Sequence, residues 1–150
     1  MSKHNGNFEI VQVTSGEYRQ LLDLFVWRRS GKNPKEFGYS AEDSSYVDDS
    51  IRCRPSLDKD YYRVFAAKAD NEFAGYVAVV MIPKADCRIG VLYVDELWVA
   101  EPFRKRGMAK ALMQRVVELG RDHRVWRIRL CTDIDNLAAR KLYTGMGFSE

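Results

Sequence analysis

A short basic segment, Arg104-Lys105-Arg106-Gly107-Met108-Ala109, carries the clearest chemistry in this sequence. It follows an apolar stretch at 91–99 that favours a β-strand, and it opens an amphipathic pattern at 104–120 that favours a helix. A strand-to-helix joint offers unpaired backbone N–H groups, the positive end of a helix dipole and, in this case, cationic side chains. Such a joint binds phosphate, and the small residues Gly107 and Ala109 let a pyrophosphate approach the backbone.

The pattern Arg104-x-x-Gly107-x-Ala109 resembles the acetyl-coenzyme A signature of the GNAT superfamily of N-acetyltransferases, Gln/Arg-x-x-Gly-x-Gly/Ala. A second segment, 136–148, is similar to the family's Asn-x-x-Ala-x-x-x-Tyr…Gly-Phe pattern. The resemblance implies an N-acetyltransferase that moves the acetyl group of acetyl-coenzyme A to a primary amine by direct attack in a ternary complex. It also implies acetyl-coenzyme A as co-substrate, and no metal.

Asp95 and Glu96 are the two acidic residues of the expected strand at 91–99. Transfer to an amine requires a neutral amine, so a carboxylate or a water chain should accept its proton. Either residue is a candidate base or an anchor for a cationic substrate. Either could instead face solvent, because neighbours on a strand point to opposite faces. The resemblance favours Asp95, with Glu96 close behind, and a β-bulge at this point would upset the alternation.

The next three residues, Leu97-Trp98-Val99, match the family segment that pairs with the pantetheine arm like an added strand. The resemblance then places the N–H of Leu97 or Trp98 at the acetyl oxygen, as a donor to the developing oxyanion. The alternative is a plain core strand.

On the expected last helix, Asn136, Ala139 and Tyr143 share a face at helical spacing. The resemblance implies that Asn136 hydrogen-bonds the pantetheine and that Ala139 lets it approach. Tyr143, with an ordinary pKa of about 10, would donate a proton to the departing thiolate. Core packing is the alternative role for this tyrosine.

The phosphate end would combine backbone amides at 106–110 with charge-assisted contacts from basic side chains, some of them to the ribose 3′-phosphate. The cofactor-binding residues implied are Leu97, Trp98, Val99, Arg104, Lys105, Arg106, Gly107, Met108, Ala109, Lys110, Asn136 and Ala139.

Hydrophobic periodicity supplies the elements that must position these residues. It predicts strands at 8–13, 62–69, 73–82, 91–99 and 125–131, and helices at 18–31, 41–51, 104–120 and 134–146. The strand at 125–131 should lie parallel to the strand at 91–99 across the crossover helix. The expected fold is α/β (α+β), with a mixed, mostly antiparallel central sheet flanked by helices, in a single GNAT-like domain over 1–150.

One departure from the family concerns the end of the sequence. GNAT proteins usually carry one or two strands after the closing Gly-Phe, whereas only Ser149 and Glu150 follow Phe148. We therefore expect those C-terminal strands to be missing, and what replaces them is left open.

Composition narrows the class of protein. A chain of 150 residues with 46% hydrophobic and 30% charged residues is typical of one globular domain. The net charge of +3 suits a polyanionic cofactor. No apolar run has membrane-spanning length and the first ten residues lack a signal-peptide core, so we expect a cytoplasmic protein without a membrane partner. Two histidines argue against histidine-based triads and metal sites, and the three cysteines are expected to be reduced and mostly buried.

The acceptor is less constrained than the cofactor. Asp95, Glu96 and an acidic cluster at 42–49 indicate a small cationic amine, such as a polyamine or an aminoglycoside, although the cluster could simply be a solvated surface. A peptide or protein amine is the alternative acceptor. Homodimers are common in the families this chain resembles, and the sequence leaves the oligomeric state open.

Two other classes of function compete with an enzyme. A coenzyme A-binding module with little turnover would keep the basic loop. A nucleic-acid binder would use the basic loop together with arginines that surround Trp126, namely Arg121, Arg124, Arg127 and Arg129. Alternating solvent-facing positions on a strand account better for these arginines, so no nucleic-acid partner is expected.

Overall fold

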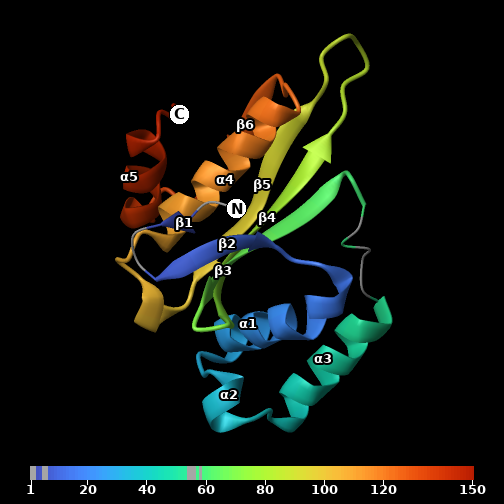
Figure 1. Ribbon diagram of the computed structural model, residues 1–150, viewed down its shortest axis with the longest axis vertical. Coiled ribbons are helices and arrows are strands. Elements are labelled where there is room, and N and C mark those ends of the chain that lie inside the picture. Colours follow the sequence, from blue (N-terminus) through green and yellow to red (C-terminus); the bar gives the residue numbers. More distant parts are fainter. Residues whose placement is uncertain (1–2, 5–6, 54–56, 58) are drawn as a thin grey trace.

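The computed structural model describes residues 3–4, 7–53, 57 and 59–150. Its centre is a six-stranded sheet in the order β1-β2-β3-β4-β5-β6 (Figure 1). The strands are β1 (Lys3–His4), β2 (Phe8–Gln12), β3 (Tyr62–Ala69), β4 (Glu72–Ile82), β5 (Val91–Val99) and β6 (Arg127–Leu130). Neighbouring strands pair antiparallel except β5 and β6, which pair parallel. The expected mixed, mostly antiparallel sheet is confirmed.

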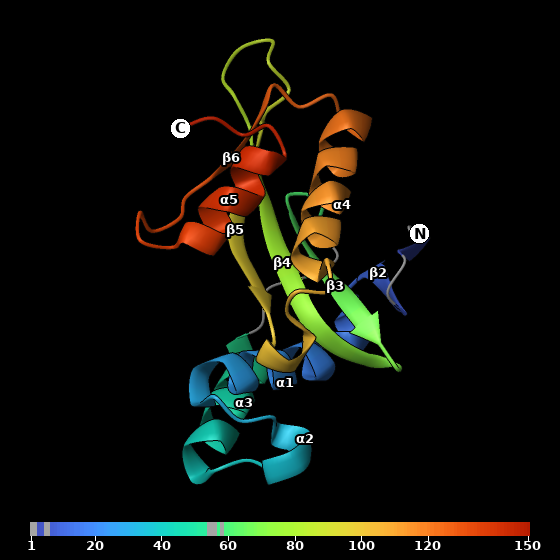
Figure 2. The same ribbon diagram turned by 90° about the vertical axis from the view of Figure 1, so that its left-hand side faces the viewer.

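Helices cover both faces of this sheet (Figures 1 and 2). On one face lie α1 (Tyr18–Ser30) and α3 (Ala41–Cys53), with the short α2 (Pro34–Phe37) beside α1. On the other lie α4 (Met108–Asp122) and α5 (Leu137–Gly145). Alternate residues of the strands feed two separate cores, because successive side chains of a strand point to opposite faces. Phe65 and Val77 pack with Leu112 of α4, whereas Tyr76 and Ala78 pack with α1.

Local signals explain where α1 begins and ends. A short 3₁₀ turn, η1 (Ser15–Glu17), precedes it, and the backbone N–H of Thr14 donates to the Glu17 carboxylate over 3.2 Å, as expected for a capping box. Gly31 closes the helix with a left-handed φ of 78°. Between β3 and β4, Asp70 and Asn71 adopt φ values of 51° and 63°, which suit a tight two-residue hairpin.

Three elements in the C-terminal part of the chain are shorter than predicted or begin later. A second 3₁₀ turn, η2 (Glu101–Phe103), follows β5, and α4 begins at Met108 rather than near Arg104. The reason is backbone conformation, because Lys105 and Gly107 have φ values of 63° and 83°, which a right-handed helix does not allow. The strand expected at 125–131 is limited to β6, and the last helix is limited to α5.

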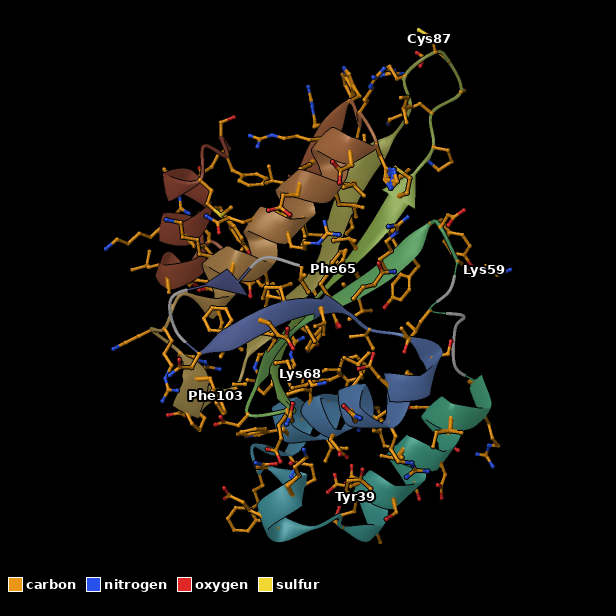
Figure 3. The ribbon with its side chains drawn as sticks, in the orientation of Figure 1. Tyr39, Lys59, Phe65, Lys68, Cys87 and Phe103 are labelled. Atoms are coloured by element: carbon orange, nitrogen blue, oxygen red, sulfur yellow. The ribbon has the colours of Figure 1, made fainter. Side chains whose placement is uncertain are left out.

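The prediction of mostly buried cysteines was wrong. Cys53, Cys87 and Cys131 are all exposed free thiols. Cys53 is the last residue of α3, Cys131 directly follows β6, and Cys87 lies at the tip of the β4–β5 loop, far from the helices of α1 to α3 (Figure 3). None of these positions faces either core. Within the described residues, no helix combines the length and the apolar character needed to span a bilayer.

Candidate functional site

The strands β5 and β6 separate partway along their length. They are paired from Val91 opposite Arg127 to Val94 opposite Leu130, and β5 then continues to Val99 paired with β4 only. On the β6 side, residues 95–99 have no strand partner among the described residues. The gap leaves a length of free strand edge facing the loop before α4 and the start of α5.

The ladder between β4 and β5 decides which backbone groups occupy this free edge. The N–H of Ala100 donates to the carbonyl oxygen of Ala74 over 2.9 Å. Because hydrogen-bonded pairs recur at every second residue of an antiparallel ladder, Trp98 and Glu96 also direct their N–H and C=O groups to β4. The N–H and C=O groups of Leu97 and Val99 therefore point away from β4, into the gap.

A β-bulge separates the two acidic residues of β5. Ala78 is opposite Glu96 and Val79 is opposite Val94, so Asp95 is the extra residue without a partner on β4. Both carboxylates are exposed. Burial raises the pKa of the Tyr62 hydroxyl on β3 to about 12, and the charges of both carboxylates add to this rise. The bulge thus overrides simple alternation and brings both carboxylates to one region of the protein.

The loop between β5 and α4 forms a cradle of backbone amides. The first intrahelical bond of α4 runs from the N–H of Ala111 to the carbonyl of Gly107, at 3.0 Å. The N–H groups of residues 108–110 therefore have no partner within the helix. Left-handed backbone at Lys105 and Gly107 turns the chain around these groups, and a Cβ built at Gly107 meets no atom within 4 Å. This open cradle, at the positive end of a 15-residue helix, suits an anion.

The helix α5 contributes an amide from its N-cap and a phenol from its last turn. The Oδ1 of Asn136 accepts a hydrogen bond from the N–H of Ala139 at 3.1 Å, which caps the helix and leaves the side-chain NH₂ as a donor. Two turns later, Tyr143 is only 8% exposed, and its ring makes an edge contact with Phe148 at 6.0 Å between centroids. Burial raises the pKa of the Tyr143 hydroxyl, so the group is protonated at neutral pH.

These features line one cleft of about 820 Å³, which we call the β5–α5 cleft. With one exception, every site residue predicted from the sequence lines it: Asp95, Glu96, Leu97, Trp98, Val99, Arg104, Lys105, Gly107, Met108, Ala109, Lys110, Asn136, Ala139 and Tyr143. The exception is Arg106, whose guanidinium instead lies 5.4 Å from the centroid of the Phe103 ring. Figure 3 shows Phe103 beside the lower end of the sheet, in the η2 turn.

Arg28, to which the sequence assigned no role, also lines the cleft, from the last turn of α1. Its Nη1 donates to the hydroxyl of Tyr76 at 2.6 Å, and that hydroxyl donates to Oε2 of Glu96 at 3.1 Å. Neither Arg28 nor Tyr76 carries a local signal of function, since Arg28 is a basic residue in the last turn of a helix and Tyr76 is a core residue of β4. Only the packing of α1 on the sheet brings them to Glu96.

The acidic cluster at 42–49 does not line the cleft, which favours the alternative that it is a solvated surface. Asp43 instead accepts a hydrogen bond from the N–H of Ser40 at the start of α3, and Asp49 pairs with Arg52. On β6, Arg127 and Arg129 are exposed and alternate with half-buried neighbours, as expected for solvent-facing positions.

Known proteins with similar sequences indicate the family of this chain. Residues 21–148 match the model of the acetyltransferase (GNAT) family. A curated relative from Arabidopsis thaliana, GCN5-related N-acetyltransferase 4, chloroplastic, is 38% identical over 66 residues, which are 44% of this chain and 23% of that protein. The chain thus matches about a quarter of that relative's length.

Solved structures share the whole fold. An aminoglycoside acetyltransferase from an uncultured soil metagenomic sample has a TM-score of 0.69 at 24% identity, with 95% of this chain and 92% of that chain covered. The aminoglycoside N-acetyltransferase AAC(6')-Iy, solved in complex with CoA, has a TM-score of 0.71 at 20% identity, with coverages of 100% and 93%. At these identities the likeness establishes the fold. With the family model covering most of its length, the chain belongs to the GNAT family of acetyltransferases.

Proposed function

We propose that this protein is an acetyl-coenzyme A-dependent N-acetyltransferase that acts on a primary amine by direct attack in a ternary complex. One observation carries the proposal: a free strand edge and an amide cradle lie in the same cleft. Alternating N–H and C=O groups on the β5 edge suit an arm that contains amides, such as pantetheine. The cradle at α4 suits the pyrophosphate to which that arm is joined. The donor set of the cleft therefore fits coenzyme A.

Basic side chains support the phosphate end of this arrangement. Arg104, Lys105 and Lys110 line the cleft beside the cradle and can add charge-assisted contacts to the pyrophosphate or to the ribose 3′-phosphate. Arg106, which lies over Phe103, is the weakest candidate of the basic loop for a direct phosphate contact.

The acetyl end would use groups from β5 and α5. The N–H of Leu97, rather than that of Trp98, is free of β4 and can donate to the carbonyl oxygen of the acetyl group, where negative charge develops. Tyr143 holds its proton at neutral pH and can give it to the departing thiolate. Asn136 has its amide NH₂ available for the pantetheine arm, and Ala139 leaves room for it.

For the proton of the acceptor amine we favour Asp95. It sits on the bulge, is exposed to the cleft and, among the described residues, has no basic side chain within salt-bridge distance. Glu96 lies next to it and is held by Arg28 and Tyr76. The acceptor we propose is a small cationic amine attracted by these carboxylates, with polyamines and aminoglycosides as candidates. The amine of a peptide or protein is the alternative.

The release of free thiol from acetyl-coenzyme A tests the proposal. The purified chain would be given a panel of amines that includes putrescine, spermidine, an aminoglycoside and a short peptide with a free amino terminus. Amine-dependent thiol release that is lost in Asp95→Asn supports the enzyme. Binding of coenzyme A without thiol release from any amine would favour a coenzyme A-binding module instead.

A further inference from the structure

Arg28 brings a positive charge into the acceptor end of the β5–α5 cleft. It belongs to the last turn of α1, and its side chain is 40% exposed. Its Nη1 lies 3.7 Å from Oε1 of Glu96, and the same nitrogen donates to the Tyr76 hydroxyl at 2.6 Å. The guanidinium therefore faces Glu96 both directly and through the tyrosine.

The tyrosine makes this arrangement rigid. Tyr76 is only 1% exposed, and its ring makes an edge contact with Phe25 of α1, at 4.8 Å between centroids. Its hydroxyl accepts from Arg28 and donates to Glu96 at 3.1 Å. A phenol that cannot move, with both of its hydrogen-bonding functions in use, fixes the positions of both charged partners.

Asp95 and Glu96, the two carboxylates that β5 contributes to the cleft, consequently differ in how far their negative charge is offset. Glu96 has a cation and a hydroxyl donor, whereas Asp95 has neither among the described residues. The charges of both carboxylates also act on Tyr62, but this phenol is uncharged at neutral pH and cannot offset either of them. In the cleft, Arg28 offsets the charge of Glu96, and the charge of Asp95 remains for the acceptor.

We infer that Arg28 is a specificity-determining residue, which neutralises Glu96 and so selects acceptors with one positive charge over diamines and polyamines. The inference rests on the proposed function and narrows its acceptor class, because among small cationic amines it favours monoamines over the polyamines and aminoglycosides named above. One carboxylate attracts one ammonium group, and a second ammonium group on the same small molecule would meet Arg28 and be repelled. Replacement of Arg28 by a neutral side chain should release Glu96 as a second anionic site.

The test compares butylamine with putrescine, which share a four-carbon chain and differ by one amine. Each would be titrated calorimetrically into protein saturated with coenzyme A, and the apparent KM of each would be measured by thiol release from acetyl-coenzyme A. The wild type should bind butylamine more tightly than putrescine, because the second ammonium group of putrescine meets Arg28. Arg28→Gln should increase the preference for putrescine about fivefold, the contribution of a partly exposed ion pair.

Three variants separate charge from structure. Arg28→Lys keeps the charge and should retain the wild-type preference. Arg29→Gln removes the same charge from the next residue of α1, whose guanidinium lies over the Tyr46 ring at 3.9 Å, and should also retain it. Glu96→Gln, tested because Arg28→Gln could disturb α1, should shift the preference further toward butylamine, since Arg28 then stands unopposed.

The possible results are distinct. A putrescine preference that rises in Arg28→Gln alone supports the inference. Two results would overturn it. One is an unchanged preference in both Arg28→Gln and Glu96→Gln, and the other is the absence of measurable binding and thiol release with both amines in every variant. In either case, continued binding of coenzyme A would still support the coenzyme A site. Loss of coenzyme A binding by the wild type would instead refute the proposed function itself.

Discussion

The side chain of Arg104 turns back toward the strand before it, and its Nε donates a hydrogen bond of 2.9 Å to the carbonyl oxygen of Val99. That carbonyl is one of the β5 groups that point away from β4. Arg104 therefore ties the end of the free strand edge to the loop that carries the amide cradle. The two parts of the cleft that fit coenzyme A are held in register by one side chain.

Replacement of Arg104 by alanine should weaken coenzyme A binding more than the removal of a single surface charge would, because the bond to Val99 is also lost. Calorimetric titration should show a roughly tenfold increase in Kd, equivalent to about 1.4 kcal/mol. Arg104→Lys is the matched control, because it keeps the charge but cannot reproduce the Nε hydrogen bond, and it should recover only part of the affinity. Full affinity in both variants would mean that the bond to Val99 does not organise the site.

Replacement of Gly107 by alanine should destabilise the fold without steric clash. Its φ of 83° is left-handed, and a Cβ there would meet no atom within 4 Å, so the cost is conformational, about 1 kcal/mol. Thermal unfolding should show Tm lower by roughly 2 to 4 °C for a chain of this size. Gly145→Ala is the control, since that glycine is the last residue of α5, has no left-handed φ and also has open space around it. An equal fall in both variants would argue against strain at Gly107.

Replacement of Tyr143 by phenylalanine should reduce turnover roughly a hundredfold, as expected for the loss of a general acid. The ring and its contact with Phe148 remain, so coenzyme A affinity should be unchanged. Because burial raises the pKa of Tyr143 above its ordinary value of about 10, wild-type turnover should not lose this acid below that pH. Tyr61→Phe, at an exposed position outside the cleft, serves as control. Unaltered turnover in Tyr143→Phe would remove this residue from the mechanism.

Alkaline pH should destabilise the protein through its buried tyrosines. Burial, with the charges of Asp95 and Glu96, raises the pKa of Tyr62 to about 12, and burial also raises the pKa values of Tyr76 and Tyr143. A raised pKa in the folded state means that the unfolded chain ionises first. The free energy of unfolding should therefore be unaffected by these groups below pH 10, and should fall as the pH rises from about 10 toward 12. Urea denaturation at stepped pH measures this fall, and Tyr62→Phe should make it shallower.

The sequence predicted those parts of the site whose signals are local. The segment from β5 to α4 combines a strand pattern, a glycine and a helical stripe within a few residues, and the face shared by Asn136 and Tyr143 follows from helical spacing. The parallel pairing of β5 with β6 follows from the crossover through α4.

What the sequence could not provide depends on tertiary packing. Arg28 is 48 residues from Tyr76 in sequence, and Tyr76 is 20 residues from Glu96. These three residues meet only because α1 packs on the face of the sheet to which the side chains of Tyr76 and Glu96 point. The bulge itself has no local sequence marker, and it determines how Asp95 and Glu96 are displayed. The single-domain organisation and the cytoplasmic location remain predictions.

The most direct test of the central claim is calorimetric titration of the purified chain with coenzyme A, acetyl-coenzyme A and the dephospho form that lacks the 3′-phosphate. The amide cradle of α4 and the basic side chains beside it predict micromolar binding of the first two ligands, and weaker binding of the dephospho form that is also more tolerant of salt. Absence of binding by all three would contradict the assignment of the β5–α5 cleft to coenzyme A. Equal affinity for all three would place the 3′-phosphate away from the basic loop.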